Sequence, residues 1–335
     1  MTRVAVVKGN DPYETTLEAL NLIADDILVS QSEVLLKPNL LLTKKFPLAV
    51  TDPRVCAAVA DFLREQKDII TIKLGEGTTG GNPPDTFESM NNNGYLPYQD
   101  RWQPIDFSKD IPGKWFPIYN PGNSRKLELG IAKTAIETPY LVSIPKFKTH
   151  DVLGLTLSLK NLMGTLTAAR DAATKEIIDN ETTRVCGYMH GFGNKKPDKL
   201  TDHQNTGPSK VALAINLIRL ASTLLPNLAI IDGIEAMEGD GPGSHGTRKN
   251  LGMIIAGTDF IAVDSVASYI AGMDLSHFQY LYQAGLRGLG EFRLDLISIV
   301  GESIADIRSP FHPHRLYSHA KFTEDEIATL EQNLV

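Results

Sequence analysis

The stretch YLVSIPKFK, residues 140–148, sets the fold that we expect for this chain of 335 residues. It begins as a short apolar run, and a proline and two lysines follow. Such a run, bounded by a turn-forming residue, is typical of a strand buried on both faces of a parallel sheet. Six other segments have the same character, at residues 3–9, 33–40, 69–77, 228–243, 252–259 and 296–302.

Helical patterns lie between many of these runs. TDPRVCAAVADFLREQ, from Thr51, has Thr51 or Asp52 as its N-cap, Pro53 in its first turn and an apolar stripe that includes Val59 and Phe62. Residues 208–225 and 258–272 are predicted to form two further helices. This alternation predicts an α/β fold with a mostly parallel sheet, helices on both faces and two lobes around a cleft.

The expected domain organisation follows the same pattern. We expect residues 1–275 to form the α/β domain and residues 276–335 to pack on it as a C-terminal extension. Two segments, 78–125 and 167–207, interrupt the alternation with polar and turn-forming residues, and we interpret them as lids or surface excursions.

Composition excludes several classes of protein. A formal net charge of −7 argues against a general nucleic-acid binder. No apolar run of transmembrane length and no signal-peptide pattern occur, so we expect a cytoplasmic protein without membrane contacts. The two cysteines, Cys56 and Cys186, cannot form an iron–sulfur or four-cysteine zinc site alone. We expect both to be buried thiols.

Polar residues directly beyond the strands are candidates for a site, because parallel strands place their carboxyl ends at one edge. His150 follows the strand of the opening stretch, and its ordinary pKa near 6.5 suits proton transfer. Lys146 and Lys148 alternate as on an extended segment, where both would hold a carboxylate or phosphate. The alternative is a solvated basic face at a helix entry. Lys37 and Asn39 flank a proline and would add to the anion site, or form a plain strand-end turn.

Lys160 and Asn161 lie among apolar residues in GLTLSLKNLMG, residues 154–164, which we predict to be a turn and a short helix. A lysine there without a partner would be costly to bury. We therefore expect Lys160 to contact either an acidic residue in a buried ion pair or a ligand, and Asn161 to contact substrate.

Four carboxylates are candidates for a divalent metal site. Glu76 lies between two glycines after a strand, and Asp232, Glu238 and Asp240 fall within DGIEAMEGDGPG, residues 232–243. Carboxylates at strand ends bind hard cations such as Mg²⁺ through oxygen. The alternatives are a solvated turn at Glu76 and an acidic helix start at 232–243.

The order of several motifs resembles a known family. LLKPNLL, TDPRVCAAVADFLRE, GEG, IPKFKTHDVLGLTLSLKNLMGTL, DGIEAMEGDGP and AGTDFIAVDSVASYIAG together resemble the DUF362 family over roughly residues 30–275. The resemblance implies that relatives carry a ferredoxin-like iron–sulfur module. Two cysteines cannot supply it, so we expect no iron–sulfur cluster from this chain alone.

A shorter element is similar to the nickel-pincer lactate racemases. His150, Gly154, Thr156, Lys160 and Gly164 have the spacing H-x3-G-x-[ST]-x3-K-x3-G. The resemblance implies that His150 is a catalytic acid/base and that Lys160 anchors a cofactor or substrate. The racemases carry a metal-ligand histidine about 16 residues beyond the lysine, and residues 174–178, TKEII, contain none.

These patterns lead to one main functional hypothesis and two alternatives. The main one is an enzyme, of isomerase or lyase type, that acts on a small anionic metabolite by acid/base proton transfer with a divalent metal. The second is a redox accessory protein that borrows an iron–sulfur cluster or flavin from a partner protein. The third is a non-catalytic anion-binding module.

Overall fold

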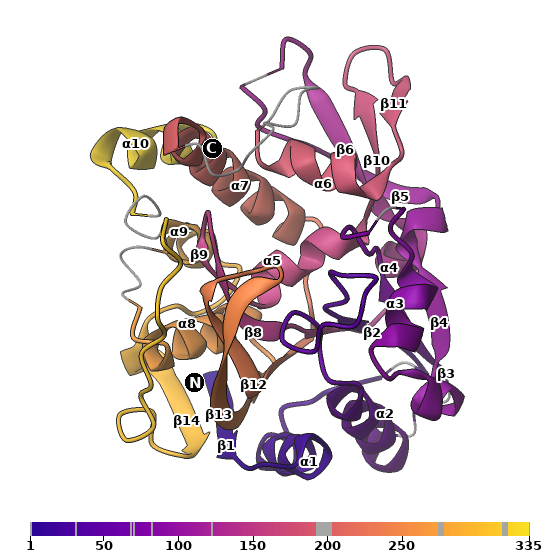
Figure 1. Ribbon diagram of the computed structural model, residues 1–335, viewed down its shortest axis with the longest axis vertical. Coiled ribbons are helices and arrows are strands. Elements are labelled where there is room, and N and C mark those ends of the chain that lie inside the picture. Colours follow the sequence, from indigo (N-terminus) through magenta and orange to yellow (C-terminus); the bar gives the residue numbers. More distant parts are fainter. Residues whose placement is uncertain are drawn as a thin grey trace.

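The computed structural model describes residues 2–30, 32–67, 69, 71–81, 83–121, 123–191, 203–273, 278–316 and 321–334. Within these ranges, ten strands form a central sheet in the order β14-β1-β13-β12-β7-β2-β3-β4, with β8 beside β12 and β9 beside β8 (Figure 1). A second, four-stranded sheet has the order β11-β10-β6-β5. The central strands are β1 (Thr2–Lys8), β2 (Glu33–Pro38), β3 (Thr71–Glu76), β4 (Gln103–Asp106), β7 (Leu141–Ile144), β8 (Lys146–His150), β9 (Gly154–Thr156), β12 (Leu228–Asp240), β13 (His245–Gly257) and β14 (Ile297–Gly301).

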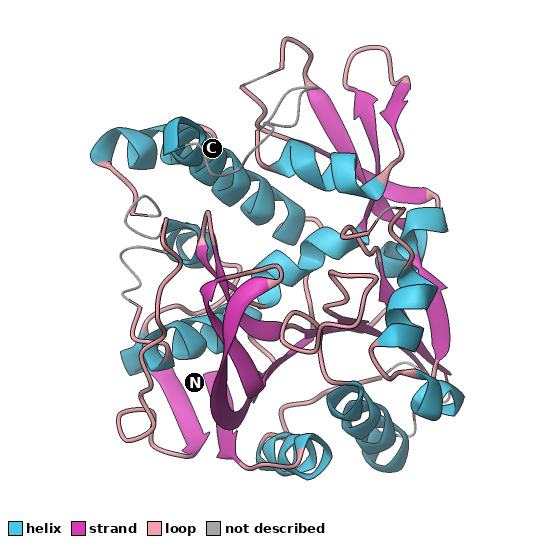
Figure 2. Ribbon diagram, viewed as in Figure 1, coloured by secondary structure: helices cyan, strands magenta, loops and turns pink. Residues whose placement is uncertain are grey.

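The remaining elements flank the central sheet or belong to the smaller one. The smaller sheet consists of β5 (Pro112–Pro117), β6 (Leu127–Ala132), β10 (Leu166–Asp171) and β11 (Ile177–Asp179). The helices are α1 (Pro12–Leu22), α2 (Pro53–Lys67), α3 (Thr86–Asn92), α4 (Lys133–Glu137), α5 (Ser158–Asn161), α6 (Thr182–Met189), α7 (His203–Ala221), α8 (Phe260–Ile270), α9 (Gln279–Leu286) and α10 (Glu324–Gln332). Figure 2 shows these helices on both sides of the central strands.

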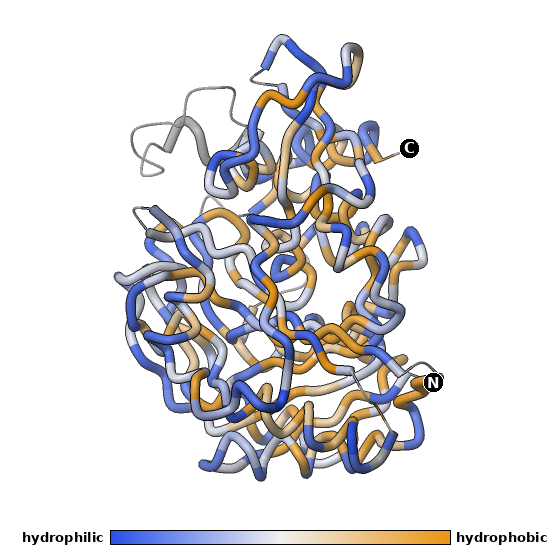
Figure 3. Tube along the Cα trace, turned by 90° about the vertical axis from the view of Figure 1, so that its right-hand side faces the viewer, coloured by the Kyte–Doolittle hydropathy of each residue, from blue (hydrophilic) through white to orange (hydrophobic). Residues whose placement is uncertain are grey.

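Period-two alternation along the strands divides the core into two layers. Val4 and Val6 of β1 pack in one hydrophobic cluster with residues of α7 and α8, whereas Ala5 and Val7 pack in the other with residues of α1 and α2. In Figure 3 the strands through the middle of the molecule are mostly orange to white, and blue stretches gather at the periphery. The predicted α/β fold with helices on both faces of a mostly parallel sheet is therefore confirmed.

The strand pairing departs from a purely parallel sheet at β13. This strand is antiparallel to both β1 and β12, and it forms a long hairpin with β12. Consequently Asp232 lies inside β12 and not beyond its end, and residues 232–240 are strand and not a helix start. The pairs β2–β3, β2–β7, β7–β12 and β8–β12 are parallel, so they share one carboxyl edge.

The segments expected outside the core contain regular structure. Residues 78–125 include β4, which pairs with β3 in the central sheet, and residues 167–207 include β11 and α6. Residues 192–202 lie outside the described part. In the region 276–335, β14 pairs with β1 and α10 contacts α7. None of the described helices has the length and apolar character needed to cross a membrane.

Candidate functional site

A cavity of about 310 Å³ lies at the carboxyl edge of the parallel strands. Its walls come from the ends of β2 and β3, from β8, β9 and α5, and from α6, which follows the smaller sheet. Of the residues predicted for the site, Asn39, Glu76, Lys148, His150, Lys160 and Asn161 line it. The expected cleft is thus built by segments that are far apart in the sequence.

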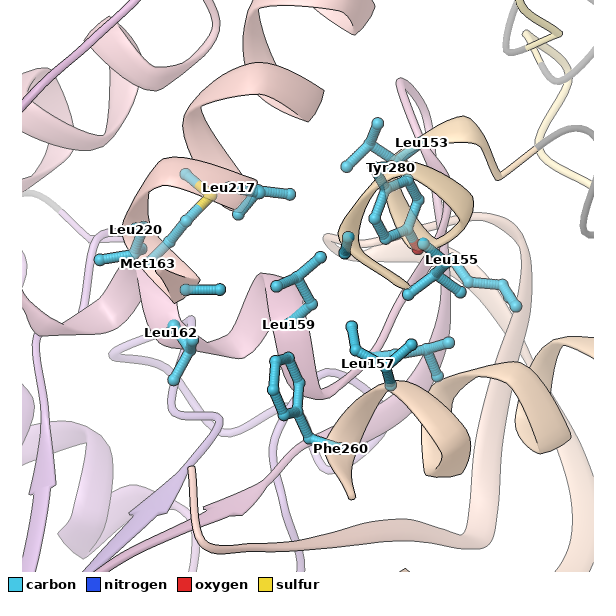
Figure 4. Close-up of a cluster of buried hydrophobic side chains, with 14 of the residues drawn as sticks. Leu153, Leu155, Leu157, Leu159, Leu162, Met163, Leu217, Leu220, Phe260 and Tyr280 are labelled. Carbon is cyan, nitrogen blue, oxygen red and sulfur yellow. The ribbon is translucent and has the colours of Figure 1, made fainter. Parts of the chain in front are cut away.

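In residues 153–164 the apolar side chains pack in the core, and most of the polar ones face the cavity. β9 is extended, so Thr156 faces the cavity while its two neighbours are buried in the core. In α5 and the short 3₁₀ turn Leu162–Thr165, helical spacing then directs Lys160, Asn161 and Gly164 to the cavity. Figure 4 shows the core side of this segment, where the cluster includes Leu153, Leu155, Leu157, Leu159, Leu162, Phe260 and Tyr280.

A buried polar network connects five of the predicted residues. Lys37 Nζ donates to both carboxylate oxygens of Glu76, at 2.8 and 2.9 Å, and to Asn161 Oδ1 at 3.3 Å. Asn39 Nδ2 also donates to Asn161 Oδ1, and Asn39 Oδ1 accepts from Lys148 Nζ at 2.9 Å. The Glu76 carboxylate accepts two further bonds from the backbone N–H groups of residues 40 and 77. Lys37 and Glu76 therefore form a saturated ion pair at the base of the cavity.

Lys148 and Lys160 differ from Lys37 because their partners are neutral. Lys148, 1% exposed, donates to Asn39 Oδ1 and to the carbonyl oxygen of Ala49. The half-buried Lys160 has the Met163 sulfur, at 3.5 Å, as its hydrogen-bond partner. Among the described residues, neither lysine has a carboxylate within ion-pair distance. Burial lowers the pKa of Lys148 well below its ordinary value, and burial also lowers that of Lys160.

His150 is held in one protonation state by the β8–β9 turn. Its Nδ1 accepts from the backbone N–H groups of Val152 and Leu153, at 3.1 and 3.2 Å. Asp151 Oδ1 also lies 3.1 Å from Nδ1. The two N–H donors already occupy the Nδ1 lone pair, so this contact is not an ion pair. Burial and the nearby Lys160 lower the pKa of His150 well below its ordinary value, which leaves a neutral ring with its proton on Nε2.

Thr156 is a cavity residue that carried no predicted role of its own. It pairs with Lys148 across β8 and β9, it is 3% exposed, and its hydroxyl has no hydrogen-bond partner among the described residues. A buried hydroxyl without a partner is costly unless a ligand or water supplies one. The sequence signal for Thr156 was its place at the Ser/Thr position of the motif shared with the racemases. Asp151, Cys186 and His190 also line the cavity without having been predicted for it.

Lys146 does not join Lys148 in the cavity. Its Nζ contacts Asp232 Oδ2 at 2.9 Å, both side chains are buried, and Lys146 lines a separate groove beside α2. The register between β12 and β8 shifts between the Lys146–Asp232 pair and the Lys148–Met237 pair. Such bulges bend and twist a strand. We attribute the different surroundings of the two lysines to this shift.

The four carboxylates predicted for a metal lie in three separate places. Glu76 pairs with Lys37, and Asp232 pairs with Lys146. Glu238 and Asp240 lie near the tip of the β12–β13 hairpin, where they contact Lys249 and Arg315. Within the described ranges, no group of three or more His, Cys, Asp or Glu side chains is arranged to hold a metal ion. These residues do not fit the predicted metal, so we derive no step through one.

Asp264 of α8 is hydrogen-bonded to the backbone of the segment that carries Lys160 and Asn161. Its two carboxylate oxygens accept from the backbone N–H groups of Ser158 and Leu159, at 2.8 and 3.0 Å. The side chain is buried in the core, and burial raises the pKa of Asp264 to about 7 in spite of these bonds. No local pattern connects this aspartate with residues about a hundred positions earlier.

The raised pKa of Asp264 predicts a pH-dependent stability. An unfolded aspartate has a pKa near 3.9, so the folded state holds this proton more tightly. The resulting stabilisation is complete below about pH 4 and is lost as the pH rises to about 7. We expect the free energy of unfolding of the wild type to fall over this window relative to that of Asp264→Asn, by about 1.4 kcal/mol per pKa unit. Urea unfolding at pH 5 to 8 checks this, and parallel profiles for the two proteins would contradict it.

Comparison with known proteins supports the resemblance seen in the motifs. The family model described as Domain of unknown function (DUF362) matches residues 34–269. The thylakoid-associated protein sll1697 of Synechocystis sp. (strain ATCC 27184 / PCC 6803 / Kazusa) is 30% identical over 245 residues, which cover 72% of this chain and 63% of the relative. The alignment thus spans less than two thirds of that relative's length. The lactate racemase apoprotein from Thermoanaerobacterium thermosaccharolyticum aligns over 82% of this chain and 58% of its own, with a TM-score of 0.47 and 11% identity. That similarity is too low to support an argument.

Proposed function

Because this chain belongs to the DUF362 family, whose description states no activity, we propose its function from the residues of the cavity: it is an enzyme that binds a small organic anion and transfers a proton to it. Lys148, Lys160 and Thr156 bind the anion in this proposal. His150 assists the proton transfer through its Nε2–H group. Lys37, Glu76, Asn39 and Asn161 hold the binding residues in place and do not contact the substrate's charge.

The convergence of Lys148, Lys160 and Thr156 on one cavity carries the proposal. All three side chains offer hydrogen-bond donors, and no described carboxylate lies within ion-pair distance of the two lysines, although Asp151 and Glu76 act on them from farther away. Two like charges in a poorly solvated cavity repel each other, and Lys160 accordingly helps to lower the pKa of Lys148. A bound carboxylate or phosphate would attract both lysines, which offsets their repulsion, and would give the Thr156 hydroxyl a hydrogen-bond partner.

The neutral ring of His150, with its proton on Nε2, supports a role as a hydrogen-bond donor to the substrate. With Nδ1 engaged by two backbone N–H groups, the ring presents only its Nε2 proton to a ligand. A neutral imidazole in such a setting donates a strong hydrogen bond to the oxyanion that develops during proton transfer. Loss of turnover on removal of His150 separates this enzyme from an anion-binding module.

Anion binding is expected to depend on the two lysines without carboxylate partners. Hydrogen bonds that involve charged groups are worth about 1.5–3 kcal/mol, so Lys148→Met and Lys160→Met should each weaken binding by roughly tenfold or more. Affinity should also fall as the pH rises, because burial makes both lysines lose their protons at a lower pH than usual. Calorimetric titration with inorganic phosphate and with acetate at low salt measures both effects.

Lys133→Met serves as the matched control. Lys133 is about half exposed on α4 and pairs with Glu137, so its replacement removes one positive charge away from the cavity. We expect this variant to bind both anions as the wild type does. Equal weakening in all three variants would show a non-specific charge effect, and the anion site would then have to be abandoned.

A further inference from the structure

We propose that the ligand is an organic anion with a body larger than its charged group, and that this body lies across α6 at Gly187. The inference rests on the proposed function, because it takes the charged group to be bound at Lys148 and Lys160. It goes further in assigning Gly187 as the residue that sets the size of the ligand.

The size of the cavity is the first argument. Its volume is about 310 Å³. One water molecule has a share of about 30 Å³ of liquid volume, so the cavity offers roughly ten times that space. An inorganic phosphate or a three-carbon acid would leave much of it to water. Ligand sites for larger organic molecules begin at about this volume.

The distribution of polar and apolar groups around the cavity is the second argument. The donors that we assign to the anion come from neighbouring positions of β8, β9 and α5. The rest of the lining is mixed: Leu41, Met163 and Pro242 contribute apolar surface, and Thr79, Asp151, Thr183 and His190 contribute polar groups. A ligand that matches this lining has one charged end and an uncharged, partly apolar body.

Gly187 supplies the third argument, because its neighbourhood differs from that of the other glycines in the cavity. A Cβ atom at Gly77 would lie 2.7 Å from the carbonyl oxygen of Gly164, and one at Gly164 would collide with Glu76. Packing therefore requires both of those glycines. At Gly187 a Cβ atom would meet no atom of the described residues within 4 Å, although the residue lies inside α6. Glycine destabilises a helix relative to alanine, so here it costs helix stability and keeps one wall of the cavity open.

The experiment compares anions that share a charged group but differ in body. Phosphate is paired with phenyl phosphate, and acetate with phenylacetate, in titrations of the wild type, Gly187→Ala and Gly187→Leu. The wild type should bind the aromatic member of at least one pair about tenfold or more tightly, because a phenyl ring buries substantial apolar surface. Gly187→Leu should lose that advantage while its affinity for phosphate and acetate stays within about twofold of the wild type. Gly187→Ala should melt at or above the wild-type temperature, which shows that α6 tolerates a side chain.

Two results would overturn the inference and leave the proposed function intact. In one, the wild type binds both members of each pair equally well, but Lys148→Met weakens them. In the other, a folded Gly187→Leu keeps the full advantage of the aromatic anions or loses phosphate and acetate equally. If the wild type bound none of the four anions, the proposed function itself would fail and the inference with it.

Discussion

Replacing Lys37 by methionine is expected to lower the free energy of unfolding by about 3–5 kcal/mol, the usual cost of breaking a buried ion pair by removing one partner. Lys37 is fully buried and Glu76 is 3% exposed, so the variant would leave a carboxylate in the core without its cation. Asn161 Oδ1 would lose one of its two donors as well. Urea unfolding followed by circular dichroism measures the loss.

Lys160→Met is the matched comparison for Lys37→Met. The two lysines line or adjoin the same cavity, but Lys160 is half-buried and contacts no described carboxylate. Its replacement should change the free energy of unfolding by less than about 1 kcal/mol, as for substitutions that break no buried network. The double variant Lys37→Met/Glu76→Gln should recover part of the loss, because the isolated charge is gone. If Lys37→Met and Lys160→Met cost the same, the division of the lysines into paired and ligand-binding ones is wrong.

Local patterns were enough to predict some of the elements around the cavity, but not α6, because residues 167–207 were interpreted as a lid or surface excursion. The apolar run before Lys146 became β7, and the stripe through Val59 and Phe62 became the buried face of α2. These signals are local, because a strand or helix needs only its own periodicity to be recognised. The shared carboxyl edge of parallel strands accounts for Glu76 and His150 lining one cavity, with Lys37 bonded to Glu76. Asp232 was expected in the same cleft, but it pairs with Lys146 outside this cavity.

Local patterns could not predict which side chains from distant segments contact each other. Lys146 and Lys148 look equivalent in an extended stretch, and only the register shift against β12 separates them. For Lys160 the pattern predicted either an acidic partner or a ligand, and the structure shows no acidic partner within ion-pair distance among the described residues. The unsatisfied Thr156 hydroxyl and the open space at Gly187 are properties of the assembled cavity, and of the two only Thr156 had a signal in the sequence, the Ser/Thr position of the motif shared with the racemases.

Two substitutions of His150 are expected to separate its chemical role from its structural one. In asparagine, Oδ1 is bonded to Cγ as Nδ1 is in histidine, so His150→Asn keeps an acceptor for the N–H groups of Val152 and Leu153 but loses the Nε2 proton. Glutamine reverses this, because its amide nitrogen lies near the position of Nε2 and its side chain leaves the two N–H groups without an acceptor. The pair therefore tests each ring nitrogen in turn.

We expect His150→Asn to fold with nearly wild-type stability and to lose turnover by about 10²–10⁴-fold, the usual contribution of a positioned acid or base. Its affinity for phosphate should change little, because the lysines remain and a proton-transfer group acts chiefly in the transition state. His150→Gln should instead lose about 1–3 kcal/mol of stability for each buried N–H group left without a partner. Turnover of an anion found in the binding experiments, measured with urea unfolding of both variants, decides between the roles. Wild-type turnover in a folded His150→Asn protein would remove His150 from the chemistry and leave the cavity as an anion-binding site alone.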